Sequence, residues 1–468
     1  MKVMKSCDRP PLGQPVSPAL RAAIVVVLAL ASARAPADLK AAATAYEAGD
    51  FQTAHREFRS LAELGDPIAQ YNLGILYLRG EGVRKSAATG YAWLKLAADA
   101  KHPAAMESEA GLRPLYGDDA AAIVADLEAR FGLTHIRESR LPEILPDCEY
   151  SERTPARLVK RTRVAYPVDA QFDGAEGWMT VEFSIAPDGT ARDYTILSSN
   201  APDLWRGAIE QAMREWRWEP AMRSGAPVWS RSGLSFRFDI SDEKNHRIDK
   251  WIGGVKTKAE AGDPVQQYLY AVVLTGHPQL KKPWSDGLPW IEKAALSGFA
   301  LAEYHLGVSL LDGRGCTADR DKALYWLQRA AAKNVAEAQY LLALEMAEDP
   351  APVRMATTPI DLLRKASATH RPAKLALARA LATAPEVTTA DMAEAVSLSA
   401  EALKRSPRDP SALEAHAAAL ATAGRFEEAI KHQQSALRAA QSRGWALEPM
   451  QQRLTAYQRR EPWRGPID

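Results

Sequence analysis

A repeat of 36 residues constrains the fold of this 468-residue chain more than any other feature. One tyrosine position and one tryptophan position recur at this interval, and a further copy of the same template lies 233 residues upstream, at 71–98. A single repeat of this size cannot bury its apolar side alone, so the copies must stack on one another. The equivalent positions are Tyr268, Tyr304 and Tyr340, and Trp290, Trp326 and Leu362.

Each copy has the pattern of two helices joined by a glycine turn. In one copy Leu324, Leu327 and Ala331 lie three and four residues apart, which is the spacing of one apolar helix face. Gly313 and Gly315 supply the backbone freedom that a tight turn between helices needs. The repeats therefore predict α-solenoids made of helical hairpins.

This unit resembles the Sel-one-like repeat, a relative of the tetratricopeptide repeat. The family pattern Ala-x-x-x-Leu-Gly, Gly-x-Gly-Val and Trp-x-x-x-Ala-Ala is matched within 69–98, and in a later copy Cys316 replaces the usual valine. The resemblance covers about 40–105 and 259–443, with a final unit closer to a plain tetratricopeptide, and it implies surfaces for protein contact. The glycines at 80 and 82 indicate a turn, because no strand precedes them and no Gly-Lys-Ser/Thr follows.

Between the two arrays the period changes from helical to alternating. Apolar and polar residues alternate over 178–185, Pro187-Asp188-Gly189 has the chemistry of a turn, and a second strand is expected over 191–197. We expect a helix after an Asn200 cap, with apolar positions from Trp205 to Trp216, and then a strand over 234–240. The order β-β-α-β predicts a small α+β domain, and the whole chain is a multidomain α+β protein.

This domain resembles the C-terminal domain of the TonB family over about 155–240. That family binds an extended peptide of an outer-membrane transporter by strand addition, which implies a recognition surface at 163–167 and 232–240. The implied partner-binding residues are Arg163, Tyr166, Pro167, Trp178, Trp229 and Arg237, and for the two tryptophans contact and core roles remain alternatives. The matching residues include Tyr166-Pro167, Glu176-Gly177-Trp178, Pro187-Asp188-Gly189 and Trp216-Arg217-Trp218-Glu219-Pro220.

The first 35 residues have the features of a secretory signal. Basic residues precede the uncharged run Ala22–Ala33, and Ala33-Arg34-Ala35 fits a signal-peptidase site. A retained membrane anchor is the alternative, but about twelve helical residues reach only about 18 Å. In an oxidising compartment Cys148 and Cys316 are candidates for a disulfide, although we expect two separate thiols because they lie in different modules.

Composition and motifs give no sign of catalysis. The net charge is +1, so neither nucleic acid nor an anionic membrane surface is an expected partner. The nine histidines are dispersed, no Gly-x-Ser-x-Gly motif occurs, and neither Cys148 nor Cys316 has a nucleophile signature. We therefore expect no enzymatic activity, no catalytic residue, no metal and no cofactor.

The leading hypothesis is a periplasmic adaptor of a Gram-negative bacterium that binds proteins or peptides, among them segments of outer-membrane transporters. One alternative is an energy transducer anchored in the inner membrane, although here the TonB-like domain lies mid-chain; another is an envelope enzyme with an unrecognised site. The predicted division is a signal peptide (1–35), helical repeats capped by a helix at about 118–131 (36–132), a linker (133–154), the TonB-like domain (155–241), a linker (242–258), a solenoid (259–445) and a tail (446–468).

Overall fold

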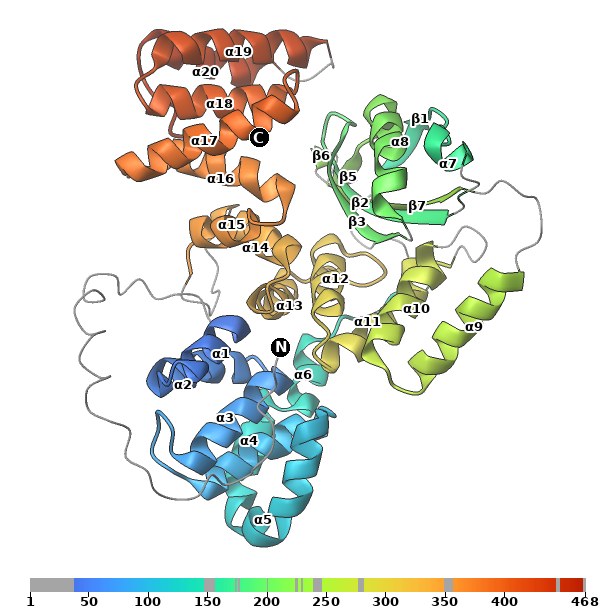
Figure 1. Ribbon diagram of the computed structural model, residues 1–468, viewed down its shortest axis with the longest axis vertical. Helices are drawn as coiled ribbons and strands as arrows, with labels where there is room; N and C mark the ends of the chain where they lie inside the picture. The colour runs from blue at the N-terminus through green and yellow to red at the C-terminus, as the bar shows by residue number, and fades with distance from the viewer. Residues whose placement is uncertain are drawn as a thin grey trace. The chain divides into compact units, whose positions relative to one another are not determined.

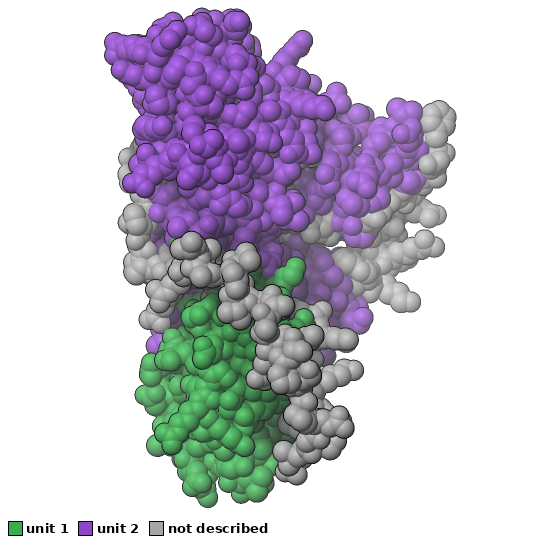
Figure 2. All heavy atoms as spheres, turned by 60° about the vertical axis from the view of Figure 1, so that its left-hand side comes forward, with its two compact units in different colours: residues 1–132, 354–357 green, residues 133–353, 358–468 purple. Residues whose placement is uncertain are grey.

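The structure is a computed structural model, and two compact units divide the chain. One unit comprises residues 1–132 and 354–357, and the other residues 133–353 and 358–468 (Figure 2). The expected signal peptide lies outside the described residues, and none of the helices in the described ranges is both long and apolar enough to cross a membrane. The described residues are 38–146, 156–172, 175, 177–199, 201–223, 226–228, 230–238, 246–276, 282–348, 357–442 and 447–465.

The first unit is a stack of helical hairpins (Figure 1). Gly80 ends one helix in the left-handed region with φ of +74°, and Gly82 follows with φ of +70°. A Cβ atom at Gly82 would lie 2.0 Å from the carbonyl oxygen of Phe51, so only glycine fits this turn. The helices are α1 (Leu39–Glu47), α2 (Phe51–Ala62), α3 (Pro67–Arg79), α4 (Ala87–Asp99) and α5 (Pro103–Phe131).

The capping helix of this unit is longer than we expected. The prediction placed it at about 118–131, whereas α5 begins at Pro103 and continues through Pro114. Pro103 fits the first turn of the helix, where its missing N–H has no intrahelical partner to lose. An internal proline and two glycines, at 111 and 117, interrupt the apolar period, which is why the pattern indicated a break where the backbone stays helical.

The second unit contains the other helical array (Figure 1). Three of its helices occupy parts of segments that we predicted to be linkers or tail. α6 occupies part of 133–154, α9 part of 242–258, and α20 part of 446–468. The helices are α6 (Leu133–Arg140), α9 (His246–Glu260), α10 (Pro264–Gly276), α11 (Trp284–Leu296), α12 (Ala300–Asp312), α13 (Arg320–Ala332), α14 (Ala336–Glu348), α15 (Pro359–Ala366), α16 (Arg371–Thr383), α17 (Thr389–Arg405), α18 (Pro410–Thr422), α19 (Phe426–Gln441) and α20 (Glu448–Gln458).

Each of these three helices buries at least one apolar side chain. Ile136 of α6 and Tyr457 of α20 belong to apolar clusters of the array, and Val255 of α9 is also buried. Their stripes are too short to stand out as a repeat, and burial against a preformed array supplies the stability that isolated short helices lack.

A buried glutamine links the helices of successive hairpins at one repeat position. Its side-chain amide donates a hydrogen bond to the carbonyl eight residues earlier in three of the copies, which satisfies an acceptor at the end of the preceding helix. In the copy at 300–335 this position is Glu303, whose side-chain carboxylate has no N–H to donate. The three bonds are Gln70 to Ala62 (3.3 Å), Gln267 to Ala259 (3.2 Å) and Gln339 to Ala331 (3.0 Å).

Glu303 instead holds a buried ion cluster. Arg329 donates through Nε to its carboxylate at 2.9 Å, and Lys333 Nζ lies 2.7 Å and 2.8 Å from the two carboxylate oxygens. The exposed fractions of the three side chains are 0%, 1% and 7%. Lys333 also donates to the carbonyl of Gly298 at 2.9 Å. One repeat thus replaces a neutral amide contact with charged contacts in the same place.

The small domain has the predicted order β-β-α-β, embellished by short strands. Its main sheet is antiparallel with the order β3-β2-β7, and α8 packs on one face of it. Trp205 and Ile209 of α8 lie in one core with Met179, Val181 and Phe183 of β2. The elements are β1 (Arg157–Lys160), α7 (Val168–Phe172), β2 (Gly177–Ile185), β3 (Ala191–Ser199), α8 (Pro202–Glu215), β4 (Arg217–Glu219), β5 (Ala221–Arg223), β6 (Ala226–Val228) and β7 (Ser230–Phe238).

The ends of α8 differ in detail from the prediction. The cap residue is Ala201, which makes no side-chain cap bond, and the expected cap Asn200 lies outside the described residues. Trp216 follows the last helical residue in an extended conformation, and its buried indole donates to the carbonyl of Thr162 at 2.9 Å. Trp216 therefore ties the segment after β1 to the core and is not part of the helix face.

Candidate functional site

The sheet of the small domain has two outer strands, β3 and β7. β2 pairs with both, so its own hydrogen-bonding groups are used on each side. Among the strands that the structure describes, no other pairs with β3 or β7, since β1 pairs with β4 and β5 with β6. An outer strand presents N–H and C=O groups to which a further extended chain can add.

The turn between β2 and β3 packs against the backbone of Trp218. Gly189 has φ of +75°, and a Cβ atom there would lie 2.1 Å from the carbonyl oxygen of Trp218. The N–H of Trp218 in turn donates to the carbonyl of Gly189 at 3.0 Å. The Pro-Asp-Gly turn and the Trp-Arg-Trp motif are therefore one packed unit that holds the hairpin in place.

The predicted Tyr-Pro segment lies beside the end of β7. The ring of Tyr166 contacts those of Phe238 and Trp205 edge-on, with centroids 5.6 Å and 5.8 Å apart, and its hydroxyl donates to the carbonyl of Ala175. Tyr166 and Pro167 are half-buried, whereas Arg163 is exposed. The two parts of the expected surface are thus adjacent, although Tyr166 also serves the core.

Two further predicted residues face each other across the β2–β7 ladder. Trp178 pairs with Arg237 in register, and the side chain of Trp178 is 42% exposed. For Arg237 the structure describes the backbone alone, and Trp229 lies outside the described residues. The exposure of Trp178 fits a contact role better than a core role.

Part of the polar face of β2 is buried by the helical array. The alternation of apolar and polar residues along the strand did not indicate this burial. Glu182 is only 6% exposed, and its carboxylate accepts a hydrogen bond from the hydroxyl of Tyr304 on α12 at 2.8 Å. Burial, with Glu182 contributing, raises the pKa of Tyr268 on α10. Glu182 therefore belongs to a contact between the sheet and the helical array. No local sequence pattern could predict this contact, because Tyr304 lies 122 residues away.

A run of cations borders the Tyr-Pro segment. Arg157 forms an exposed ion pair with Glu219 at 2.6 Å, and this guanidinium lowers the pKa of the Glu219 carboxyl. The guanidinium of Arg161 lies 5.4 Å from the ring centroid of Trp216. Lys160 and Arg163 are exposed, and no carboxylate of the described residues forms an ion pair with either. This strip favours an acidic partner.

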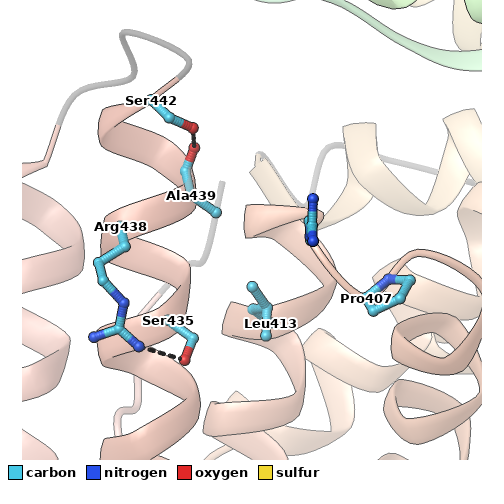
Figure 3. A pocket seen from close by; sticks show the side chains of 7 residues that line it. Pro407, Leu413, Ser435, Arg438, Ala439 and Ser442 are labelled. Carbon is cyan, nitrogen blue, oxygen red and sulfur yellow. Dashed lines mark hydrogen bonds between the residues drawn. The ribbon is translucent and has the colours of Figure 1, made fainter.

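A cavity of about 450 Å³ lies in the last hairpins, away from the predicted residues in sequence (Figure 3). The guanidinium of Arg438 donates to Ser435 Oγ at 2.9 Å, and no carboxylate lines the cavity. The sequence analysis gave no sign of it, because its residues come from a turn and two helices. The lining residues are Pro407, Arg408, Leu413, Ser435, Arg438, Ala439 and Ser442.

A histidine pair lies in the same hairpins. The rings of His416 and His432 meet edge-on with centroids 4.8 Å apart, and Nδ1 of His416 shares a hydrogen bond with Ser399 Oγ at 2.9 Å. Burial lowers the pKa of His416 to about 4, assisted by the positive charge of His432 and Arg425. Within the described ranges no three His, Cys, Asp or Glu side chains are grouped to hold a metal ion. The buried thiol of Cys316 donates to the carbonyl of Ser309 at 3.5 Å.

Two protein families match parts of the chain. Residues 162–240 match the family model for the Gram-negative bacterial TonB protein C-terminal, and residues 67–102 and 300–335 match the Sel1 repeat. The expected combination of a TonB C-terminal domain with Sel1-type repeats is confirmed.

The chain is similar to protein TonB of Escherichia coli strain K12, with 36% identity over 64 residues, which are 14% of this chain and 27% of that protein. It is 34% identical over 79 residues to protein TonB of Pseudomonas aeruginosa, covering 17% of this chain and 23% of that protein. The chain thus spans about a quarter of the length of the curated relatives that it matches.

Among solved structures, a Sel1 repeat protein from Oxalobacter formigenes is 20% identical with a TM-score of 0.34, over 42% of this chain and 82% of that one. The C-terminal domain of TonB from Pseudomonas aeruginosa is 30% identical with a TM-score of 0.18, over 19% of this chain and 92% of that one.

Proposed function

We propose that this chain is an exported, non-enzymatic adaptor of the Gram-negative envelope, which binds an extended segment of a partner protein by strand addition and further partners through its helical repeats. The observation that carries the proposal is the pair of outer strands of the β3-β2-β7 sheet, with the Tyr166 segment lying beside the end of β7. Backbone hydrogen bonds at such a margin supply affinity, and neighbouring side chains supply selectivity.

The side chains around the margin of the sheet restrict which partner segments can bind. Trp178 offers an exposed aromatic surface, and Lys160 and Arg163 offer positive charge next to the Tyr-Pro segment. The partner segment is therefore extended and carries acidic residues, and segments of outer-membrane transporters are the first candidates. Helix α10 also contacts β7.

Binding of short synthetic transporter peptides to the full chain, measured by fluorescence anisotropy, tests the proposal. Trp178→Ala and Arg163→Gln should each weaken binding about tenfold, since exposed aromatic and arginine side chains dominate such interfaces. Arg214→Gln is the matched control, because Arg214 is an exposed cation on α8, which covers the opposite face of the sheet. Peptides N-methylated at alternate backbone amides should bind much more weakly. Equal binding by methylated and unmodified peptides would exclude strand addition.

Export is tested separately by the mass of the mature protein. A chain that begins at Pro36 and fractionates with periplasmic contents is the expected result, since cleavage would follow Ala35. A chain that keeps Met1 and fractionates with the inner membrane would instead favour the anchored energy transducer.

A further inference from the structure

The segment that leads into the small domain is bound along one repeat of the second unit. Residues 140–145, here called the strap, begin at the last residue of α6 and lie against the copy at 300–335. α6 itself contacts α13. The strap was expected to be part of a linker, and a linker needs no such contacts.

Backbone hydrogen bonds hold the strap as a short antiparallel strand. Ile144 forms a β-bridge with Cys316, the N–H of Leu145 donates to the carbonyl of Gly315 at 3.1 Å, and the N–H of Thr317 donates to the carbonyl of Glu143 at 3.0 Å. The turn that receives the strap has the shape that glycine allows. Gly315 has φ of +72°, and a Cβ atom there would lie 2.8 Å from the backbone nitrogen of Ser285.

Side chains of the repeat also bind carbonyl groups of the strap. The indole of Trp326 donates to the carbonyl of Arg140 at 2.8 Å, and Lys322 Nζ donates to that of Leu141 at 3.0 Å. The aliphatic side chains of Leu141 and Ile144 pack on the cluster that contains Trp326 and the fully buried Cys316. We call these residues of the repeat the strap site: Gly315, Cys316, Thr317, Lys322 and Trp326. The strap site thus binds an extended backbone and two apolar side chains.

The equivalent tryptophan of the first unit also contacts the end of a later helix, but through its ring. Trp93 lies 233 residues before Trp326 in the shared template, and its ring stacks on that of Phe131 with centroids 5.9 Å apart. The amide of Gln70 donates to the carbonyl of Phe131 at 3.2 Å. In the first matched repeat the tryptophan thus contacts the end of α5, and in the second it contacts the end of α6.

We propose that the strap is an intramolecular ligand of the repeat at 300–335, and that the strap site accepts in its place an extended partner peptide with aliphatic side chains spaced like Leu141 and Ile144 around a proline. This deepens the repeat-mediated part of the proposed function. A partner peptide binds by displacing the strap, and displacement removes the strand that is bridged to Cys316 and the Leu141 and Ile144 side chains that pack on the cluster in which Cys316 is buried.

Alkylation of Cys316 by iodoacetamide, followed by mass spectrometry of the peptide that contains it, reports on the strap in the full-length protein. The release variant Leu141→Asp/Ile144→Asp should raise the alkylation rate about tenfold or more. Saturation with a synthetic peptide of residues 138–146 should restore protection, whereas the same peptide carrying Ile144→Asp should not. The wild-type protein should bind the labelled peptide about tenfold more weakly than the release variant does.

Two further variants keep the test decisive. Leu145→Pro removes the one N–H that donates to Gly315, without changing the array, and should raise alkylation severalfold. Met106→Asp/Leu115→Asp is the matched control, because both residues are exposed on α5, and it should leave the rate unchanged.

Protection of Cys316 that persists in both strap variants, or exposure that the peptide does not reverse, would overturn the proposal. Loss of the array's unfolding transition in both variants would also overturn it, by making the strap a structural element. Binding at the sheet margin is measured with Trp178 and Arg163 variants and does not involve Cys316, so the two proposals fail separately.

Discussion

Replacing Glu303 with the glutamine found at this position in the other repeats should destabilise the repeat, although it restores the residue that the other copies share. The substitution Glu303→Gln removes the carboxylate that both Arg329 and Lys333 contact, and the buried charge of the cluster rises from +1 to +2. Because the side chains are at most 7% exposed, water cannot replace the lost carboxylate.

The size of the effect follows from the contact distances. At an effective dielectric constant of about 20, two unit charges 2.8 Å apart attract by about 6 kcal/mol. Desolvation offsets much of this attraction in the native cluster, and removing one partner of a buried pair costs about 3–5 kcal/mol. A glutamine oxygen still accepts one hydrogen bond, so we expect a value near the lower end, about 3 kcal/mol.

Hydrogen exchange of amides in α12 and α13 is the suitable assay, because it reports the stability of this repeat separately from that of the other helices. The triple variant Glu303→Gln/Arg329→Leu/Lys333→Ala copies the first repeat, which has Gln70, Leu96 and Ala100 at these positions, and should lie within about 1 kcal/mol of the wild type.

The control is Glu428→Gln, which breaks an exposed pair with Arg425 and should change nothing measurable. If Glu303→Gln proved as harmless as this control, or if the triple variant recovered nothing, the argument from buried charge would be refuted.

Three further predictions concern the turns, the sheet contact and the last hairpins. In urea unfolding, Gly82→Ala should lower the stability of the first unit much more than Gly49→Ala does. An alanine at either position costs about 1–2 kcal/mol because φ is positive at both, but only at Gly82 would the added Cβ atom clash with backbone atoms. Equal losses of stability in the two variants would contradict this argument. Tyr304→Phe removes the hydroxyl that donates to buried Glu182, so exchange protection of β2 should fall by about 1–3 kcal/mol, and unchanged protection would show that the contact contributes nothing. Because the pKa of His416 is lowered in the folded state, unfolding takes up protons between pH 6.5 and about 4, so stability is complete above this window and falls by up to about 3 kcal/mol as the pH drops through it. His416→Gln should flatten that dependence in pH-resolved urea unfolding, and an equally steep profile would assign it to other groups.

The candidate site could be predicted only in part. The sequence indicated that the Tyr-Pro segment and the last strand belong to one domain. In the structure the ring centroids of Tyr166 and Phe238 are 5.6 Å apart. It did not predict that Glu182 would be buried, since strict alternation normally puts such a residue in water. The cavity at Arg438 and the contacts of the strap had no signature in any local window.

Helical hairpins, the glycine turns and the alternating strands follow from the chain alone, because each depends on neighbours within a turn or a strand length. Periods of 36, 3.6 and two residues are set by local geometry, and so they are legible without a structure. Contacts over long separations are not. Arg140 meets Trp326 across 186 residues, and Glu182 meets Tyr304 across 122. Such contacts depend on how whole elements stack, so only the tertiary structure decided that a linker binds a repeat and that a polar strand face is covered.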